Sequence, residues 1–123
     1  MSHRSGTLEA MTLLRAIVRP DKVEAVHEAL ARIGVSGMTI AEVRGDAIHR
    51  PASSPEGELE VKTAIDVIVS RSLVPVVIRA IIGAAQTGEP GDGRILEVPL
   101  SNTYSIRTGT RDDPRRPTLR LSD

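Results

Sequence analysis

The spacing of hydrophobic residues changes twice in the same order along the chain, and this repeated change limits the possible folds most strongly. Residues 12–18, TLLRAIV, form a short run of branched apolar side chains that is typical of a β-strand. From Asp21 onward the spacing becomes that of one helix face, with apolar residues at Val23, Val26, Leu30 and Ile33. Gly34 follows as a helix-ending residue, and residues 37–45, GMTIAEVRG, alternate as a second strand. The first half therefore predicts a strand–helix–strand unit.

The second half repeats this order. Residues 59–70, LEVKTAIDVIVS, return to β-branched character and predict a third strand. Ser72 is a candidate N-cap for a second helix, and Pro75 is tolerated in its first turn because the amide there has no helical partner. The predicted buried face of that helix consists of Val74, Ile78, Ile81 and Ala85. A glycine-rich segment ends the helix at Gly88, and residues 94–100, RILEVPL, predict a fourth strand.

Two such units predict an α+β fold, a ferredoxin-like βαββαβ sandwich with a four-stranded antiparallel sheet and both helices on one face. Residues 12–109 form the domain, between a flexible arm at 1–11 and a flexible, proline-bearing tail at 110–123. Residues 46–60 include a loop rich in proline, serine and glycine. The open face of the sheet needs a cover, and we expect a second subunit there.

Composition excludes several classes of function. The 123 residues include 16 basic and 16 acidic side chains, so bulk attraction to nucleic acid or an anionic membrane is not expected. There is no cysteine, the three histidines show no ligand spacing, and no metal site is predicted. Tyr104 is the only aromatic residue, which leaves almost nothing for stacking on bases. No apolar run reaches the ~20 residues that cross a bilayer, and we expect a soluble, cytoplasmic protein.

The segment TGEPGDGR, residues 87–94, packs three glycines in front of Arg94. Such a loop is most often a simple turn. It is also suited to an anion, because backbone amides without Cβ atoms can approach phosphate oxygens and an arginine adds a permanent charge. Spacing alone leaves both interpretations open.

Three motifs in this order resemble the PII nitrogen-regulatory signalling proteins: GMTIAEVRG, TGEPGDGR and IRTG at residues 106–109. The likeness covers about residues 13–45 and 62–109. It implies a homotrimer with its sheets inside and adenine nucleotides in the clefts between subunits. It also implies that the loop at 46–60 is a T-loop, which docks on a transporter or enzyme and reports the bound ligand.

The resemblance implies nucleotide-binding roles for Ile17, Thr39, Gly45, Lys62, Asp66, Ile68, Gly91, Asp92, Gly93, Arg94 and Arg107. Arg94 keeps the charge where most members have lysine, and Asp66 stands where members usually have glutamate. Most members carry a second basic residue where this chain has Ser105. Because one phosphate contact is then missing, we expect ADP or AMP to be favoured over ATP.

The loop DAIHRPASSPEGE, residues 46–58, is shorter than the usual T-loop and contains neither the glutamine of the metal and 2-oxoglutarate site nor the tyrosine used for uridylylation. Uridylylation at the usual site is therefore excluded, and the resemblance indicates a divergent branch. Relatives of that kind are linked to inorganic-carbon uptake and carboxysome operons, where bicarbonate is sensed with ADP or AMP. Arg44 and Lys62 are the candidate bicarbonate ligands.

Other functions remain open. No nucleophile–base pair stands out, so no catalytic residue and no enzyme activity are predicted, yet slow adenine-nucleotide hydrolysis is one alternative. Another is a nitrogen-regulatory PII protein without uridylylation, and a third is a structural oligomeric adaptor whose pocket has decayed. The target protein cannot be named from the sequence.

Overall fold

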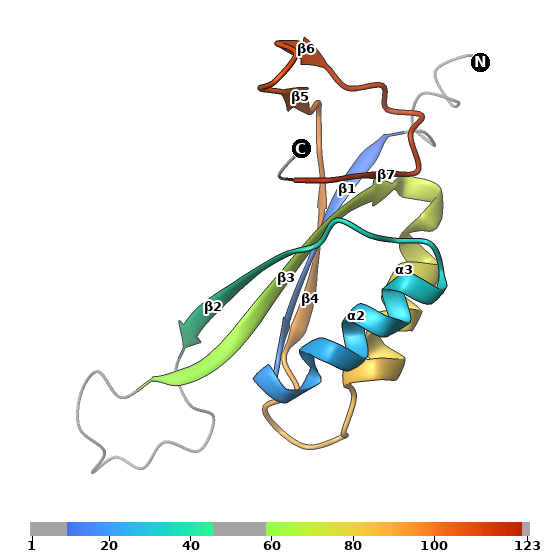
Figure 1. Ribbon diagram of the computed structural model, residues 1–123. Helices are drawn as coiled ribbons and strands as arrows, with labels where there is room; N and C mark the ends of the chain where they lie inside the picture. Colours follow the sequence, from blue (N-terminus) through green and yellow to red (C-terminus); the bar gives the residue numbers. More distant parts are fainter. Residues whose placement is uncertain (1–9, 46–58, 122–123) are drawn as a thin grey trace.

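The computed structural model describes residues 10–45 and 59–121, which form an antiparallel sheet with its helices on one face (Figure 1). The sheet order is β2-β3-β1-β4, made of β1 (Met11–Val18), β2 (Thr39–Gly45), β3 (Glu60–Ser70) and β4 (Arg94–Pro99). Short 3₁₀ turns, η1 (Pro20–Lys22) and η2 (Arg71–Leu73), lead into α2 (Val23–Arg32) and α3 (Val74–Ala85). This order confirms the predicted ferredoxin-like βαββαβ sandwich.

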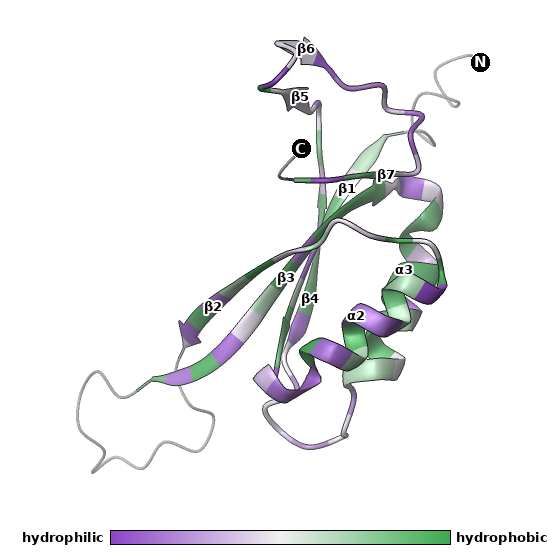
Figure 2. Ribbon diagram, in the orientation of Figure 1, coloured by the Kyte–Doolittle hydropathy of each residue, from purple (hydrophilic) through white to green (hydrophobic). Residues whose placement is uncertain are grey.

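The core lies between the helices and the sheet. Figure 2 shows α3 as largely hydrophobic, whereas α2 alternates between hydrophobic and hydrophilic residues. The largest fully buried side chains come from both helices and the two central strands: Leu14, Leu30, Ile65, Ile81, Val26, Val67, Val69 and Val77. Each such side chain contributes about 1.5–3 kcal/mol relative to leaving it in water. This aliphatic layer holds the strands in the register that builds the site described below.

The helices differ from the predicted ones at their ends. Ser72 does not cap α3, because η2 takes up residues 71–73 and the N-cap is Leu73, without a side-chain hydrogen bond. The buried face of α3 includes Val77, whereas Ile78 lies beside it and is half-buried. Helix α3 also ends at Ala85, before Gly88. Ile33 lies at the C-cap of α2 and is 39% exposed, so it is not part of the buried face.

The C-terminal segment corrects another expectation. We expected a tail without fixed structure from residue 110, but β6 (Thr110–Arg111) pairs with β5 (Tyr104–Ser105), and β7 (Thr118–Leu119) pairs with β3. Leu119 is buried in a small cluster with Met11 and Ile68. Two-residue strands carry no periodic signal, so only the tertiary contacts reveal them.

Two residues at the predicted boundaries belong to strands. Met11 begins β1 and is buried, so it belongs to the domain rather than the arm. Glu60 belongs to β3 rather than to the loop. Of the predicted arm, residues 1–9 lie outside the described residues, and Ala10 is described. Of the predicted T-loop, residues 46–58 lie outside the described residues, and Leu59 is described.

The sheet face away from the helices carries the alternate side chains of each strand. On the two strands β1 and β4 these include Leu13 opposite Val98 and Arg15 opposite Leu96. Leu96 is 40% exposed and Val98 is 41% exposed. We call this surface the open face, because within the described chain no helix covers it (Figure 1).

Candidate functional site

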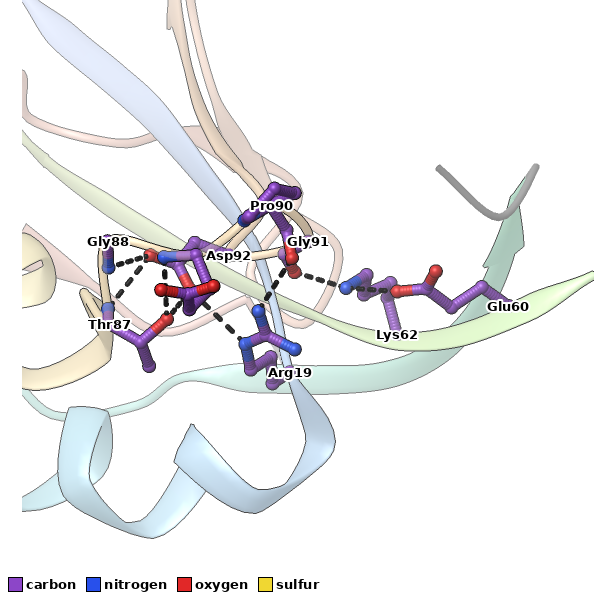
Figure 3. A network of polar contacts seen from close by, with 9 residues as sticks. Arg19, Glu60, Lys62, Thr87, Gly88, Pro90, Gly91 and Asp92 are labelled. Carbon is purple, nitrogen blue, oxygen red and sulfur yellow. Dashed lines mark hydrogen bonds and ion pairs between the residues drawn. The ribbon is translucent and has the colours of Figure 1, made fainter. Parts of the chain in front are cut away.

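The glycine-rich segment at residues 86–93 joins α3 to β4 and lies against the end of β1. The strand register explains which side chains meet it. Ile17 pairs with Arg94, so the next positions along the two strands place Arg19 opposite Asp92. Val18 pairs with Thr63 on the other side of β1, and this register places Arg19 beside Lys62. Figure 3 shows these three charged side chains converging on the loop.

The glycines of this loop are required by its backbone. Gly91 and Gly93 have φ values of +101° and +102°, in the region that disfavours other residues. A Cβ atom on Gly93 would overlap the carbonyl oxygen of Ile17. A Cβ atom on Gly91 would crowd the guanidinium of Arg19, at 3.2 Å from its nearest nitrogen. The loop therefore presents a backbone that is bare and tightly placed.

The carboxylate of Asp92 braces this loop from within. It accepts hydrogen bonds from the backbone amides of Thr87 and Gly88, both at 2.8 Å, and from Arg19 Nε at 3.1 Å. It also accepts the hydroxyl hydrogen of Thr87. The Thr87 hydroxyl is the largest of the influences that hold the pKa of Asp92 well below its ordinary value. Asp92 was predicted as a nucleotide-binding residue, and its geometry is that of a positioning residue.

Two cations tie the same loop to the sheet. Arg19 Nη2 donates to the carbonyl oxygen of Pro90 at 2.9 Å. Lys62 Nζ donates to the carbonyl oxygen of Gly91 and pairs with Glu60 (Figure 3). The Lys62 side chain is only 14% exposed, which strengthens these interactions. Lys62 thus links the glycine loop to the first residue of β3.

A cleft of about 470 Å³ adjoins the loop on the open face. Its lining unites six of the predicted site residues with Glu89 and Leu96: Ile17, Lys62, Gly91, Asp92, Gly93 and Arg94. The volume lies within the range of about 300–1,000 Å³ that is usual for small-molecule sites. Arg94 is exposed and makes no ion pair with any other described residue, so its guanidinium is available to an anion.

Other predicted residues lie elsewhere on the sheet. Thr39 pairs in register with Asp66, further along the open face. The carboxylate of Asp66 accepts two hydrogen bonds from Arg15, both at 2.8 Å. The Asp66 hydrogen bond is also the main reason why the pKa of Arg15 is raised. Asp66 therefore already has a partner, which the sequence reasoning missed.

The remaining predicted residues are dispersed. Ile68 is buried beside β7 in the cluster with Leu119. Gly45 ends β2, and the adjacent Arg44 lies 3.6 Å from Glu42 rather than beside Lys62. Arg107 follows β5, beyond the opposite end of β4 from the glycine loop (Figure 1). Within one chain the structure does not bring Arg107 and Arg94 together.

Two residues of the loop network were missed from the sequence. Arg19 directly follows β1, and Thr87 opens the glycine-rich segment. Arg19 could be found only once the strand register was known, because counting from the paired Ile17 and Arg94 leads to Asp92. The signal for Thr87 was weaker, since a hydroxyl five residues before an aspartate predicts no particular turn.

A ferredoxin-like sandwich with a glycine-rich loop before its edge strand β4 defines the class of small α+β domains to which this chain belongs. The sequence profile of the family "Nitrogen regulatory protein P-II" matches residues 11–110. The P-II protein of Klebsiella oxytoca is 36% identical over 110 residues, covering 84% of this chain and 97% of that protein. The chain therefore belongs to the P-II family.

A plant protein and its structure agree with this assignment. The P-II homolog of Arabidopsis thaliana is 36% identical over 107 residues, which cover 81% of this chain but 55% of that protein, so the chain spans about half its length. The crystal structure of Arabidopsis thaliana PII bound to citrate superimposes with a TM-score of 0.73 at 34% sequence identity. The match covers 87% of this chain and 92% of the crystallised one.

The described residues lack two further features. None of the helices there combines the length and the apolar character that crossing a bilayer demands. Residues 10–45 and 59–121 also contain no group of three or more His, Cys, Asp or Glu side chains placed to hold a metal ion.

Proposed function

We propose that this chain is a P-II-type signalling protein that binds adenine nucleotides and transmits their presence through the T-loop to a transporter or enzyme. The observation that carries the proposal is the bare glycine loop beside an unpaired Arg94. The amides of Gly91 and Gly93 lack Cβ atoms that would keep phosphate oxygens away. The guanidinium supplies a charge-assisted hydrogen bond, which is stronger than a neutral one.

The nucleotide site is completed by a second protomer of a homotrimer. Arg107 is the other predicted phosphate ligand, and it lies beyond the far end of β4 from Arg94. A ligand that uses both arginines must therefore lie between two chains. The open face supports association, because Leu96 and Val98 expose apolar surface there.

ADP and AMP are favoured over ATP in this proposal, because Ser105 offers no charge to a third phosphate. The hydroxyl of Ser105 is also engaged, since it accepts a hydrogen bond from the Thr108 amide at 3.3 Å. Arg94 and Arg107 are then the main side-chain cations for phosphate, and two phosphate groups suffice to use them.

Lys62 is the proposed link between the ligand and the T-loop. Its ammonium group contacts both the Gly91 carbonyl and Glu60, which is the last predicted residue of the T-loop. A phosphate or bicarbonate that attracts Lys62 weakens its hold on Glu60, and this difference between bound and free states is what a signal requires. Arg44 is retained as the second candidate bicarbonate ligand, although it lies beside Glu42 in the free chain.

Isothermal titration with AMP, ADP and ATP tests the proposal. We expect Arg94→Ala to weaken ADP binding by roughly 1.5–3 kcal/mol, the usual range for a hydrogen bond to a charged group. Arg79→Ala, an exposed arginine on α3, is the matched control and should leave the affinity unchanged. No binding of any adenylate by the wild type would leave the structural-adaptor hypothesis in its place.

Two further measurements separate the remaining alternatives. Steady-state phosphate release from ATP would support slow hydrolysis, whereas the signalling proposal expects none above background. Titration with 2-oxoglutarate in the presence of Mg-ATP distinguishes a nitrogen-regulatory PII protein without uridylylation, which would show strong coupling between the two ligands. The proposal expects bicarbonate, and not 2-oxoglutarate, to change the affinity for ADP.

A further inference from the structure

A second concave surface lies at the C-terminal end of the described chain. It has a volume of about 850 Å³ and is lined by residues of the β5–β6 hairpin, of the segment after it and of β7. We call it the C-terminal cleft and define it by six of its lining residues: Arg107, Thr110, Arg111, Arg116, Thr118 and Arg120. The proposed nucleotide site uses only Arg107 of this set.

The charge of the C-terminal cleft is predominantly positive. Four arginines line it, against the two carboxylates of Asp112 and Asp113. Asp112 accepts the hydroxyl hydrogen of Thr103 at 2.9 Å. Asp113 accepts three hydrogen bonds from Arg115, at 2.9 Å from the amide, 3.0 Å from Nε and 2.9 Å from Nη2. Asp113 is bound mainly by Arg115, which does not line the cleft, and the four cleft arginines outnumber the two carboxylates.

Both walls of the C-terminal cleft are held in place by the fold. In the wall formed by the β5–β6 hairpin, the Gly109 amide donates to the Ser105 carbonyl at 2.9 Å, which closes the hairpin. In the wall formed by β7, the Ser70 amide donates to the Pro117 carbonyl at 2.8 Å, and Leu119 is buried.

Arg120 is anchored as well. Its aliphatic stem lies directly against Gly37, where a Cβ atom would overlap it. The backbone that carries the cleft arginines is therefore fixed before any ligand arrives, which lowers the entropy lost on binding.

We propose that the C-terminal cleft binds a compact polyanion of the phosphate type. Like charges gathered in one cleft repel one another, and an anion with two or more charges relieves that repulsion. Guanidinium groups bind phosphate oxygens in pairs, and the hydroxyls of Thr110 and Thr118 supply further donors. All of its residues come from one chain, and it shares Arg107 with the proposed nucleotide site, whereas Arg111, Arg116 and Arg120 belong to the C-terminal cleft alone.

Titration of the full chain with inorganic pyrophosphate tests the proposal. We expect saturable binding, with amide chemical-shift changes in NMR spectra centred on residues 107–111 and 116–121. Arg116→Gln combined with Arg120→Gln should weaken binding about tenfold or more, because two charge-assisted hydrogen bonds are lost. Arg32→Gln combined with Arg79→Gln removes the same charge from the helices and should change the affinity less than about twofold.

Several results would overturn this site. Equal weakening by both double variants would mean that pyrophosphate responds only to net charge. Shift changes centred on Gly91 and Gly93 would place the anion at the glycine loop instead. Arg94→Ala separates the two proposals, since it should weaken nucleotide binding and leave pyrophosphate binding at the C-terminal cleft intact. Because the wild-type shift map needs no variant, a failure of the double variant to fold does not remove the test.

Discussion

The two ends of β4 carry the same kinds of residue and use them in opposite ways. At the start of the strand, in the glycine loop, the charged side chains of Arg19, Lys62 and Asp92 bond to one another and to the backbone, and Arg94 is left unpaired. Beyond its other end, in the β5–β6 hairpin, hydroxyl groups make most of the side-chain hydrogen bonds. There the Thr108 and Thr110 hydroxyls lie 2.7 Å apart.

This difference bears on the two proposed anion sites. A loop braced by half-buried cations holds its amides in one direction, which suits a ligand that needs precise placement. The hairpin is held mainly by hydroxyl groups, and Gly109 within it has open space around it. The glycine loop should therefore be intolerant of change, and the hairpin more tolerant.

The largest expected effect comes from adding one methyl group to the glycine loop. Gly93→Ala combines a positive φ with overlap of the Ile17 carbonyl, so β4 must shift away from β1. We expect a loss of about 3 kcal/mol in unfolding free energy, the sum of left-handed strain and backbone displacement. Chemical denaturation measures it.

Gly109→Ala in the hairpin is the matched control for that change. Gly109 has a φ of +69° but open space around it, so only the strain of about 1 kcal/mol is expected. If the two substitutions cost the same, the contrast between the two ends of β4 fails.

A smaller loss is expected from Leu119→Ala, which tests whether β7 holds the hairpin side of the molecule. Leu119 is 8% exposed and packs against Met11 and Ile68. Removing its side chain at this edge should cost about 2 kcal/mol, the low end of the range for leucine truncation. Faster hydrogen exchange at the Ser70 amide should accompany it, since that amide donates to Pro117. Leu121→Ala, at a residue that is 42% exposed, should show neither change.

The sequence was sufficient for the main elements and for six of the eight residues that line the glycine-loop cleft. Periodicity located four strands and two helices because each buries a regular stripe, and the motif TGEPGDGR located the glycine loop that lines the cleft. It could not locate β7, since two residues have no period. It also could not foresee that Asp66 pairs with Arg15, because this pairing depends on the register of β1 against β3.

The separation of Arg107 from Arg94 has a different cause. A motif search treats both residues as one site, whereas the fold places them at opposite ends of β4. Only an assembly can rejoin them, and a single sequence carries no direct record of which chain supplies which half. The proposed function therefore depends on the open face, because we expect a second subunit to associate there.

Removing one hydroxyl at each end of β4 is expected to have a still smaller effect. Thr103→Val deletes the only hydrogen bond to the Asp112 carboxylate found among the described residues, and about 1 kcal/mol should be lost. Thr87→Val removes the hydroxyl's bonds to Asp92 and to the Glu89 amide, but Asp92 keeps the Thr87 and Gly88 amides and Arg19, and the exposed Glu89 amide can bond to water, so the loss should be smaller. Unfolding free energies of the two variants test the order. A larger loss for Thr87→Val would show that the loop depends on its hydroxyl more than on its cations.

The smallest effect is a difference in acid sensitivity between the two ends. Arg115 lowers the pKa of Asp113 to about 2, and the pKa of Asp92 is also lowered, chiefly by the Thr87 hydroxyl. A carboxyl whose folded pKa is depressed stabilises the native state above its unfolded pKa of about 3.9, and this contribution is lost as the pH falls through the folded value. Stability should therefore decline from about pH 4 downward.

The four donors on Asp92 should keep the glycine loop closed when the Asp113 turn has already loosened near pH 2. Carboxyl ¹³C titration in NMR follows both residues, with Asp113→Asn as the control that removes the first transition and leaves the second. Protonation of Asp92 at a higher pH than Asp113 would contradict this order. It would mean that the four donors stabilise the charged Asp92 carboxylate less than Arg115 stabilises that of Asp113.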